Sequence, residues 1–423
     1  MLLLSLPRGR ADLDGCACSE LPLEIIERVL SFLPVHDLCR FRSVCKEWRE
    51  LLCKPSFHDL CEVNGKDDRY LFVTRDLDCD GWSVVDPVFR RTVSFLDLHD
   101  ERWYAIEVGE SLGGFDEDFL ETQLSAMDNG LLCEMSTLRG SDDDLALTIS
   151  DPVANTRMTL PAPPEIFCLG AYLPLILPSV DIVTRSYKVF LVNNPREHSR
   201  DLTRVHVYET FSNEWRGLSN PAKEFEELIA GSAVILQDVL YIVFRDIARW
   251  QFVLLSYKMQ EDVWTEVRRI ICPRKPRHPQ LVVRGHRLFM NLWSGGTSSL
   301  LEDLSLFEMI EIMPSDNSSK TVVQLTFAQL QQMFSEQDSD FYIAYGVPRF
   351  NSKGSYSSVI LMSSLSGKLI TFDLTSRTVG TIPANPFIQG PSLETYPYCD
   401  MYRAKNMNLS LRNLLSYDSV ASG

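Results

Sequence analysis

The first apolar pattern along the chain has the period of a helix and begins at Leu21. Apolar side chains recur there every three to four residues, as on one side of an amphipathic helix. The members of this first stripe are Ile25, Ile26, Val29, Leu30 and Leu33. Because a proline disfavours helical backbone at the residue before it, the pattern predicts a helix that stops at Pro34.

Two more short helices are expected downstream, from about Val35 to Ser43 and from Val44 to Leu52. A further short helix is predicted from Pro55 to Val63. Three helices within about thirty residues bury little surface on folding. We therefore expect them to lack a core of their own and to leave an apolar face for a partner.

The pattern changes from helical to strand-like after residue 68. Short apolar runs rich in Val, Ile, Leu, Phe and Tyr are separated there by Gly, Asp, Asn and Pro, as in a series of strands and turns. Examples are YLFVTR, YKVFLVNN, LYIVFR and RLFMNLW. This second part of the chain is therefore predicted to be mainly β.

An internal repeat in this part places a tyrosine seven residues before a tryptophan, in Tyr208 with Trp215 and in Tyr257 with Trp264. Weaker copies complete a set of six equivalent positions. These are Val85, Ser150, Tyr208, Tyr257, Phe307 and Phe372, in steps of 65, 58, 49, 50 and 65 residues. Propeller repeats lengthened by loops have such a period. The repeat predicts six four-stranded blades, and another all-β stack, such as an array of sandwiches, is the alternative.

The helical part resembles the F-box in a long, ordered set of residues. They are Leu21, Pro22, Glu24, Ile25, Ile26, Val29, Leu30, Leu33, Pro34, Leu38, Arg40, Arg42, Val44, Cys45, Lys46, Trp48 and Leu51. The resemblance implies docking to a Skp-type adaptor in a Skp/cullin/F-box (SCF) ubiquitin ligase. It assigns adaptor binding to Leu21, Pro22, Ile25, Ile26, Val29, Leu30, Leu33, Pro34, Leu38, Val44 and Trp48. An ordinary amphipathic helical hairpin is the alternative.

The β part resembles the kelch-like, F-box-associated propellers of plant F-box proteins. The likeness rests on Asp86-Pro87, Asp151-Pro152, Leu160-Pro161 and Tyr208 with Trp215, and the paired glycines of regular kelch blades are missing. The expected fold class is α+β and multidomain, with a small N-terminal three-helix F-box followed by a mainly-β kelch-like propeller of six blades. The expected units are a flexible lead at 1–19, the F-box at 20–63, a linker at 64–68, the propeller at 69–402 and a C-terminal tail at 403–423.

Charge bears on the partners of the chain. The net charge is −16, and the segment Asp67–Asp151 holds 21 acidic but 6 basic residues. A nucleic-acid binder needs basic side chains to neutralise phosphates, so nucleic acid is not an expected partner. The acidic segment is either a solvated surface or a landing site for a basic protein. The basic cluster of Arg268, Arg269, Arg274, Lys275, Arg277 and His278 is expected to be an exposed loop, with contact to an acidic substrate or RNA as the alternative.

The eleven cysteines and seven histidines do not form a recognisable site. The cysteines are odd in number and scattered, and the pair Cys16 and Cys18 does not have the spacing of a zinc pair. A reducing compartment, the cytoplasm and/or the nucleus, fits this usage. No apolar run approaches the length of a membrane span, and no phosphate-binding glycine loop or HExxH occurs. We therefore expect no cofactor, no metal and no membrane contact.

These observations together predict a non-catalytic substrate receptor. The F-box would bind the Skp-type adaptor and through it cullin, while the propeller holds a target protein, as yet unknown, for ubiquitination and degradation. Holding two reactants together raises their effective concentration. Two alternatives remain: an F-box propeller acting as a scaffold outside the ligase, and a propeller enzyme that carries an F-box for regulation.

Overall fold

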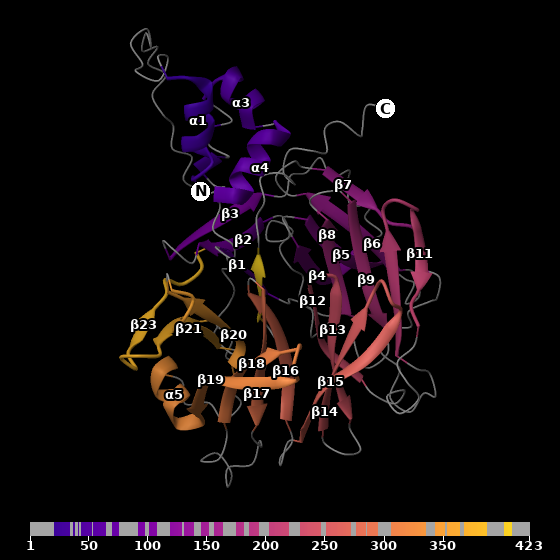
Figure 1. Ribbon diagram of the computed structural model, residues 1–423, viewed down its shortest axis with the longest axis vertical. Helices are drawn as coiled ribbons and strands as arrows, with labels where there is room; N and C mark the ends of the chain where they lie inside the picture. The colour runs from indigo at the N-terminus through magenta and orange to yellow at the C-terminus, as the bar shows by residue number, and fades with distance from the viewer. Residues whose placement is uncertain are drawn as a thin grey trace.

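The computed structural model describes most of the chain between residues 21 and 407 (Figure 1). The described residues are 21–33, 37–38, 41, 44–52, 54–64, 70–75, 92–97, 101–107, 119–128, 131–138, 145–151, 156–163, 175–181, 186–193, 203–219, 229–246, 251–271, 276–284, 286–294, 306–335, 343–351, 353–363, 368–386 and 402–407. A helical unit lies at one end of the molecule, and β-sheets form the rest.

The helical unit contains α1 (Leu23–Leu30), α3 (Lys46–Leu52) and α4 (Pro55–Asn64). Pro22 precedes the first turn of α1, where a residue without an N–H is tolerated. The helix ends at Leu30, with Ser31 as its C-cap, so it stops earlier than Pro34 predicted. α3 and α4 agree with the predicted helices, and the described residues 37, 38 and 41 of the second predicted helix are helical.

The helical unit has a core of its own, which corrects the prediction that it would lack one. Its buried members are Leu30, Leu38, Leu51 and Phe57, with Ile26, Leu33, Phe41, Trp48 and Cys61 packed around them. The prediction failed because it counted three helices, whereas α4 adds Phe57, which is completely buried. The Trp48 ring packs edge-on against Phe41, with 5.0 Å between ring centroids.

Within the described residues, the strands form six four-stranded antiparallel sheets, named A to F here. Sheet A has the order β24 (Tyr402–Met407), β1 (Tyr70–Arg75), β2 (Thr92–Asp97) and β3 (Arg102–Glu107). Sheet B consists of β4 (Phe119–Asp128), β5 (Leu131–Leu138), β6 (Leu145–Asp151) and β7 (Thr156–Thr159). Sheet C consists of β8 (Leu175–Asp181), β9 (Ser186–Asn193), β10 (Arg204–Glu209) and β11 (Glu214–Gly217).

The second half of the β region continues this arrangement. Sheet D consists of β12 (Ile229–Leu236), β13 (Val239–Asp246), β14 (Gln251–Lys258) and β15 (Val263–Ile271). Sheet E consists of β16 (Pro276–Arg284), β17 (Arg287–Ser294), β18 (Leu306–Met313) and β19 (Ser318–Thr326), followed by helix α5 (Phe327–Phe334). Sheet F consists of β20 (Ile343–Phe350), β21 (Tyr356–Ser363), β22 (Leu369–Asp373) and β23 (Val379–Thr381).

The sheets are arranged around a common centre, as Figure 1 shows. The innermost strands contact one another in the order β24, β4, β8, β12, β16 and β20, and β20 contacts β24 again. Buried apolar side chains fill the space between neighbouring sheets. Phe190 of sheet C and Phe244 of sheet D, for example, belong to one such cluster.

Strand β24 corrects the predicted boundary at residue 402. Residues 403–423 were expected to be a tail, but β24 pairs with β1 over the register Tyr70↔Met407 to Arg75↔Tyr402. Without β24, sheet A would lack an inner strand and β1 would have a free edge. The sheet region therefore continues to Met407, and residues 408–423 lie outside the described part. Of the predicted linker 64–68, Asn64 is the last residue of α4, and the remainder is outside the described part too.

The predicted repeat corresponds to one position in the sheets, the penultimate residue of each third strand. This residue pairs with the one seven positions later in the fourth strand. The pairs are Leu96↔Trp103, Ser150↔Arg157, Tyr208↔Trp215, Tyr257↔Trp264, Ile312↔Ser319 and Phe372↔Val379. The choice of Phe307 is wrong by five residues, because it pairs with Leu325. Val85 lies outside the described part, and Leu96 holds this position in sheet A.

Three of the fourth-strand residues are tryptophans that join neighbouring sheets. Each indole N–H donates to the carbonyl two residues after the last strand of the preceding sheet. The bonds are Trp103 to Pro383 (2.7 Å), Trp215 to Pro161 (2.8 Å) and Trp264 to Ser219 (2.6 Å). The first of these bonds joins sheet A to sheet F. No helix in the described part is both long enough and apolar enough to span a membrane.

Candidate functional site

Helix α1 has two apolar faces with different surroundings. Ile26, Leu30 and Leu33 pack into the core of the helical unit. Ile25 and Val29, each one residue earlier, remain exposed over 46% and 58% of their surface. The sequence placed both sets in one stripe, because neighbouring residues on a helix differ by only about a third of a turn.

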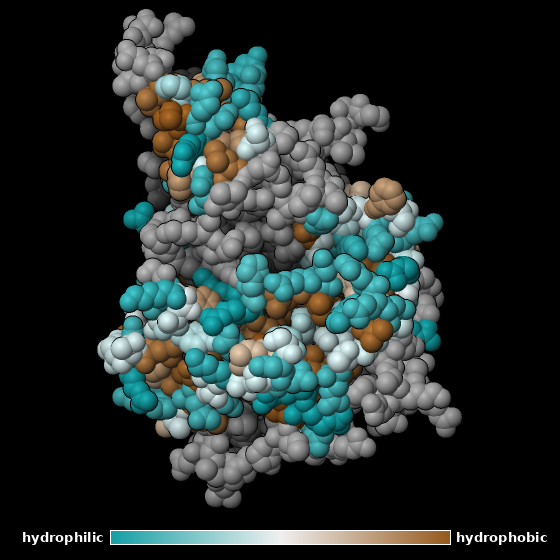
Figure 2. All heavy atoms as spheres, viewed as in Figure 1, coloured by the Kyte–Doolittle hydropathy of each residue, from teal (hydrophilic) through white to brown (hydrophobic). Residues whose placement is uncertain are grey.

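The outward face of α1 continues beyond both ends of the helix. Leu21, Ile25, Val29 and Phe32 follow one another at helical spacing, and all four are exposed. Among the described residues of the unit, the exposed large apolar ones are Leu21, Leu23, Ile25, Val29, Phe32 and Val44, named here the α1 surface. Figure 2 shows apolar side chains gathered on the helical unit. Exposed apolar surface on so small a unit indicates a protein interaction site.

The structure divides the eleven predicted adaptor-binding residues into two groups. Leu21, Pro22, Ile25, Val29 and Val44 are exposed, and Pro34 is outside the described residues. The side chains of Leu30 and Leu38 are buried, and those of Ile26, Leu33 and Trp48 are half-buried in the core. The buried and half-buried residues therefore hold the exposed residues in place and form little of the surface themselves.

Two residues of the α1 surface were missed from the sequence. Phe32 carries on the spacing of Leu21, Ile25 and Val29, and this spacing could have identified it. For Leu23 the pattern gives no such signal, since it lies between the two faces in the first turn of α1.

Polar contacts hold α1 against the other helices. Lys54 Nζ lies 3.2 Å from Glu27 Oε1, and Asn64 Nδ2 donates to Ser31 Oγ over 2.7 Å. At the start of α3, the backbone N–H of Trp48 donates to Cys45 Sγ over 3.4 Å. Hydrogen bonds from its own backbone N–H and from the Cys45 thiol lower the pKa of the Glu47 carboxyl. The contacts of Glu27 and Ser31 fix α1, and those of Cys45 lie at the start of α3.

The surface offers apolar contacts and no evident reactive group. Among the described residues there is no cluster of three or more His, Cys, Asp or Glu side chains that could hold a metal ion. What such a surface can do chemically is bind a complementary apolar groove on another protein.

The predicted basic loop is not a single loop. Arg268 and Arg269 lie on β15, and Arg277 and His278 lie on β16. Arg269 is paired with Glu266 at 2.8 Å. Arg274 and Lys275 lie outside the described residues. Proline-rich sequence suggested a loop, but Pro276 begins β16, where the first position of a strand tolerates proline.

Comparison with known proteins identifies the helical unit. The model of the F-box domain matches residues 18–60, which include α1, α3 and the start of α4. An F-box/kelch-repeat protein of Arabidopsis thaliana is 26% identical over 246 residues, which are 53% of this chain and 51% of the relative. The chain thus spans about half the length of the curated relative it matches.

Solved structures give only distant likenesses. A chain of a nidogen/laminin complex aligns with 73% of this chain and 91% of its own length, at 11% identity and a TM-score of 0.40. The Dos1 propeller aligns with 73% of this chain and 68% of its own length, at 12% identity and a TM-score of 0.38. TM-scores of this size are too low to establish a shared fold.

The helical unit with its exposed α1 surface and the antiparallel sheets behind it define an F-box protein whose second unit is mainly β. The helical unit matches the F-box domain, and about half of the chain is similar to an F-box/kelch-repeat protein of Arabidopsis thaliana.

Proposed function

We propose that this chain is the substrate-recognition subunit of an SCF ubiquitin ligase. The F-box binds a Skp-type adaptor through the α1 surface, and the adaptor links it to cullin. The observation that carries the proposal is that Ile25, Val29 and Phe32 are exposed within the residues matched by the F-box. Apolar residues placed outside a completed core are available to a partner.

We propose in addition that the sheets form a closed, six-bladed kelch-like propeller that holds the target protein. The contacts among the innermost strands support closure, because they run in order and return to β24. Sheet A also supports it, since it joins strands from both ends of the β region. In a closed propeller, loops from every blade can meet one partner.

The chain itself would take no part in the chemistry of ubiquitin transfer. Its contribution is to hold a target near the ubiquitin-conjugating enzyme, which raises the effective concentration of the reacting groups. The role requires no cofactor. We place it in the cytoplasm and/or the nucleus, because its scattered, odd-numbered cysteines fit a reducing compartment.

The test is the double variant Ile25→Asp with Val29→Asp in the full-length chain. Two charges on the α1 surface should abolish binding of purified adaptor and recovery of cullin in copurification, because each charge would be buried without a partner. Circular dichroism and thermal unfolding should stay unchanged, since both positions are exposed. Met158→Asp, at an exposed position on β7 of sheet B, is the matched control and should bind adaptor normally. Normal adaptor binding by the double variant would contradict the proposal.

A further inference from the structure

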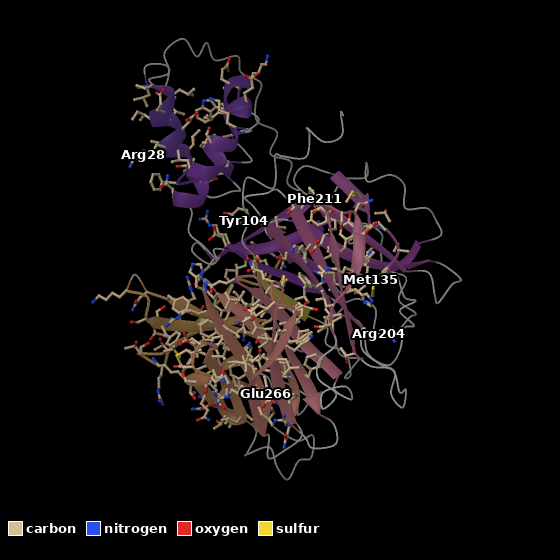
Figure 3. The ribbon with its side chains drawn as sticks, turned by 45° about the vertical axis from the view of Figure 1, so that its right-hand side comes forward. Arg28, Tyr104, Met135, Arg204, Phe211 and Glu266 are labelled. Carbon is tan, nitrogen blue, oxygen red and sulfur yellow. The ribbon has the colours of Figure 1, made fainter. Side chains whose placement is uncertain are left out.

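The most exposed large apolar residue in the described part of the chain is Phe211, at 99% exposure. It lies on the turn between β10 and β11, at an end of sheet C (Figure 3). An isolated exposed apolar residue is ordinary on a protein surface. Phe211 differs in two respects. Its turn is rigid, and the sister turns, which join the third and fourth strands of other sheets, carry polar residues at its position.

Hydrogen bonds hold the turn in one conformation on both sides of Phe211. On one side, Thr210 Oγ1 donates to the carbonyl of Tyr187 over 2.6 Å and accepts from its N–H over 2.8 Å. On the other side, the Tyr208 hydroxyl donates to Asn213 Oδ1 over 2.8 Å, and the Asn213 N–H donates to the carbonyl of Glu209 over 2.9 Å. The backbone that presents Phe211 is therefore already ordered, so a partner would not have to order it on binding.

Sister turns show that the turn does not need a phenylalanine. In each of sheets C to F, the repeat position is the penultimate residue of the third strand, as Tyr208 is in sheet C. The residue five positions after it has a positive φ. These residues are Asn213, Asp262, Asn317 and Arg377, with φ between 53° and 57°. The position of Phe211 is occupied by Gln260, Ser315 and Thr375 in sheets D, E and F. The same turn thus forms with polar residues, so folding of the turn does not require the phenyl ring of Phe211.

The charges around the turn indicate what kind of partner would bind. Near Phe211, Glu209 is paired with Lys188 at 3.3 Å and lies 3.7 Å from Arg216, so these charges satisfy one another. The adjoining sheet is different, because the strands of sheet B carry Glu121, Asp128, Glu134 and Asp151 against one basic residue, Arg157. Sheet B contacts sheet C directly, through β4 with β8 and through the bond from Trp215 to Pro161. A partner seated on Phe211 would therefore face an acidic neighbour.

We propose that Phe211 is an anchor for the target protein. Its ring enters an apolar pocket on a folded, basic target, and the basic rim of that pocket faces the acidic sheet B. Electrostatic attraction of this kind speeds encounter and selects partners, while the buried aromatic side chain supplies the affinity. This inference rests on the proposed function as a substrate receptor and assigns one residue of its target site.

The experiment uses the full-length chain and the variant Phe211→Ser, in which the turn takes the residue found in sheet E. Gln260→Ser, in the sister turn of sheet D, is the matched control. Fluorescently labelled wild type and both variants are applied to an array of purified, folded proteins, and each is also titrated with purified adaptor. We expect Phe211→Ser to lose at least tenfold of the signal on the array proteins that the wild type binds. Gln260→Ser should keep that signal, and all three chains should bind adaptor equally.

The two proposals fail in different ways. Adaptor binding that is absent in the wild type would contradict the receptor function, whatever the array shows. Adaptor binding that is normal, together with an array signal unchanged by Phe211→Ser or absent for the wild type, would overturn the anchor alone. The proteins bound should carry net positive charge and should lose binding between 0.05 and 0.5 M salt, because screening weakens attraction between exposed charges (about 10 Å Debye length at 0.1 M). Bound proteins that are acidic or insensitive to salt, or concentration-dependent dimerisation through Phe211, would overturn it as well.

Discussion

Two tyrosines hold equivalent turns with different partners. The Tyr208 hydroxyl donates to the neutral amide of Asn213, whereas the Tyr257 hydroxyl donates to the carboxylate of Asp262. Burial, together with the hydrogen bond to Asp262 and the negative charge of its carboxylate, raises the pKa of Tyr257 from 10.0 to about 12. The chain thus contains a natural comparison between a neutral and a charged version of one turn.

The pKa of Tyr257 predicts how stability depends on alkaline pH. Between pH 10 and about 12, Tyr257 loses its proton in the unfolded chain but keeps it in the folded chain. The unfolded state then binds fewer protons, so the free energy of unfolding should fall as pH rises through this window. Burial raises the pKa of Tyr208 and Tyr241 in the same direction. The measurement is therefore the difference between variants in urea unfolding from pH 8 to 11.5.

The informative variant is Asp262→Asn, which copies the turn of sheet C. Asparagine tolerates the positive φ of this position and still offers the tyrosine an acceptor, so stability at pH 8 should change little. The alkaline loss should become shallower because the charge on residue 262 is gone. Asn213→Asp is the reciprocal variant and should make the loss steeper. An identical pH dependence in the wild type and both variants would contradict this account.

At the same scale, the F-box site shows what a helical pattern leaves open. Ile25 with Val29 and Ile26 with Leu30 fit one apolar stripe equally well, and the sequence therefore assigned all four to the adaptor. The direction in which each pair points depends on where the core lies. Phe57, on α4, helps to set this, and nothing in the spacing of α1 refers to it. Helical structure was thus predictable, but the division of its apolar residues between surface and core was not.

At the scale of elements, local patterns were a good guide and long-range pairing was not. The tyrosine and tryptophan seven residues apart predicted a hairpin, because both strands and their turn lie within one short segment. Sheet E has no such aromatic pair at its turn, so the sequence repeat indicated Phe307 instead of Ile312. β24 reads YRAKNM, which is rich in polar residues, and its partner β1 lies at the other end of the β region. Nothing local could reveal that pairing.

The role of β24 is testable by truncation. A chain that ends at residue 401 lacks β24, so the backbone groups of β1 that pair with it would have no partner and the edge of β1 would be exposed. Hydrogen exchange of the Tyr70–Arg75 amides should speed up strongly, and the chain should aggregate more readily. A chain that ends at residue 407 keeps the strand and is the control. Equal exchange in the two truncated chains would show that β24 does not close sheet A.

At the scale of the whole molecule, the described residues form two units with separate cores. The core of the helical unit contains residues between Ile26 and Cys61. The clusters between the sheets contain residues from Leu96 to Ile382 and include none from α1, α3 or α4. A change that breaks one core should therefore leave the other intact, and the two proposed functions should be separable.

A cut in the predicted linker separates them. The fragment from Asp67 to Gly423 keeps all six sheets, including β24, and should fold without the helices. It should still bind the target but recover no cullin in copurification, because the α1 surface is absent. Expressed in excess, it should compete with the full-length chain, and the half-life of the target should lengthen. The same fragment with Phe211→Ser separates competition from simple overexpression, since it should fold equally well and leave the half-life unchanged. A soluble fragment that binds the target without lengthening its half-life would contradict the receptor function, because a receptor that has lost its ligase must protect what it holds.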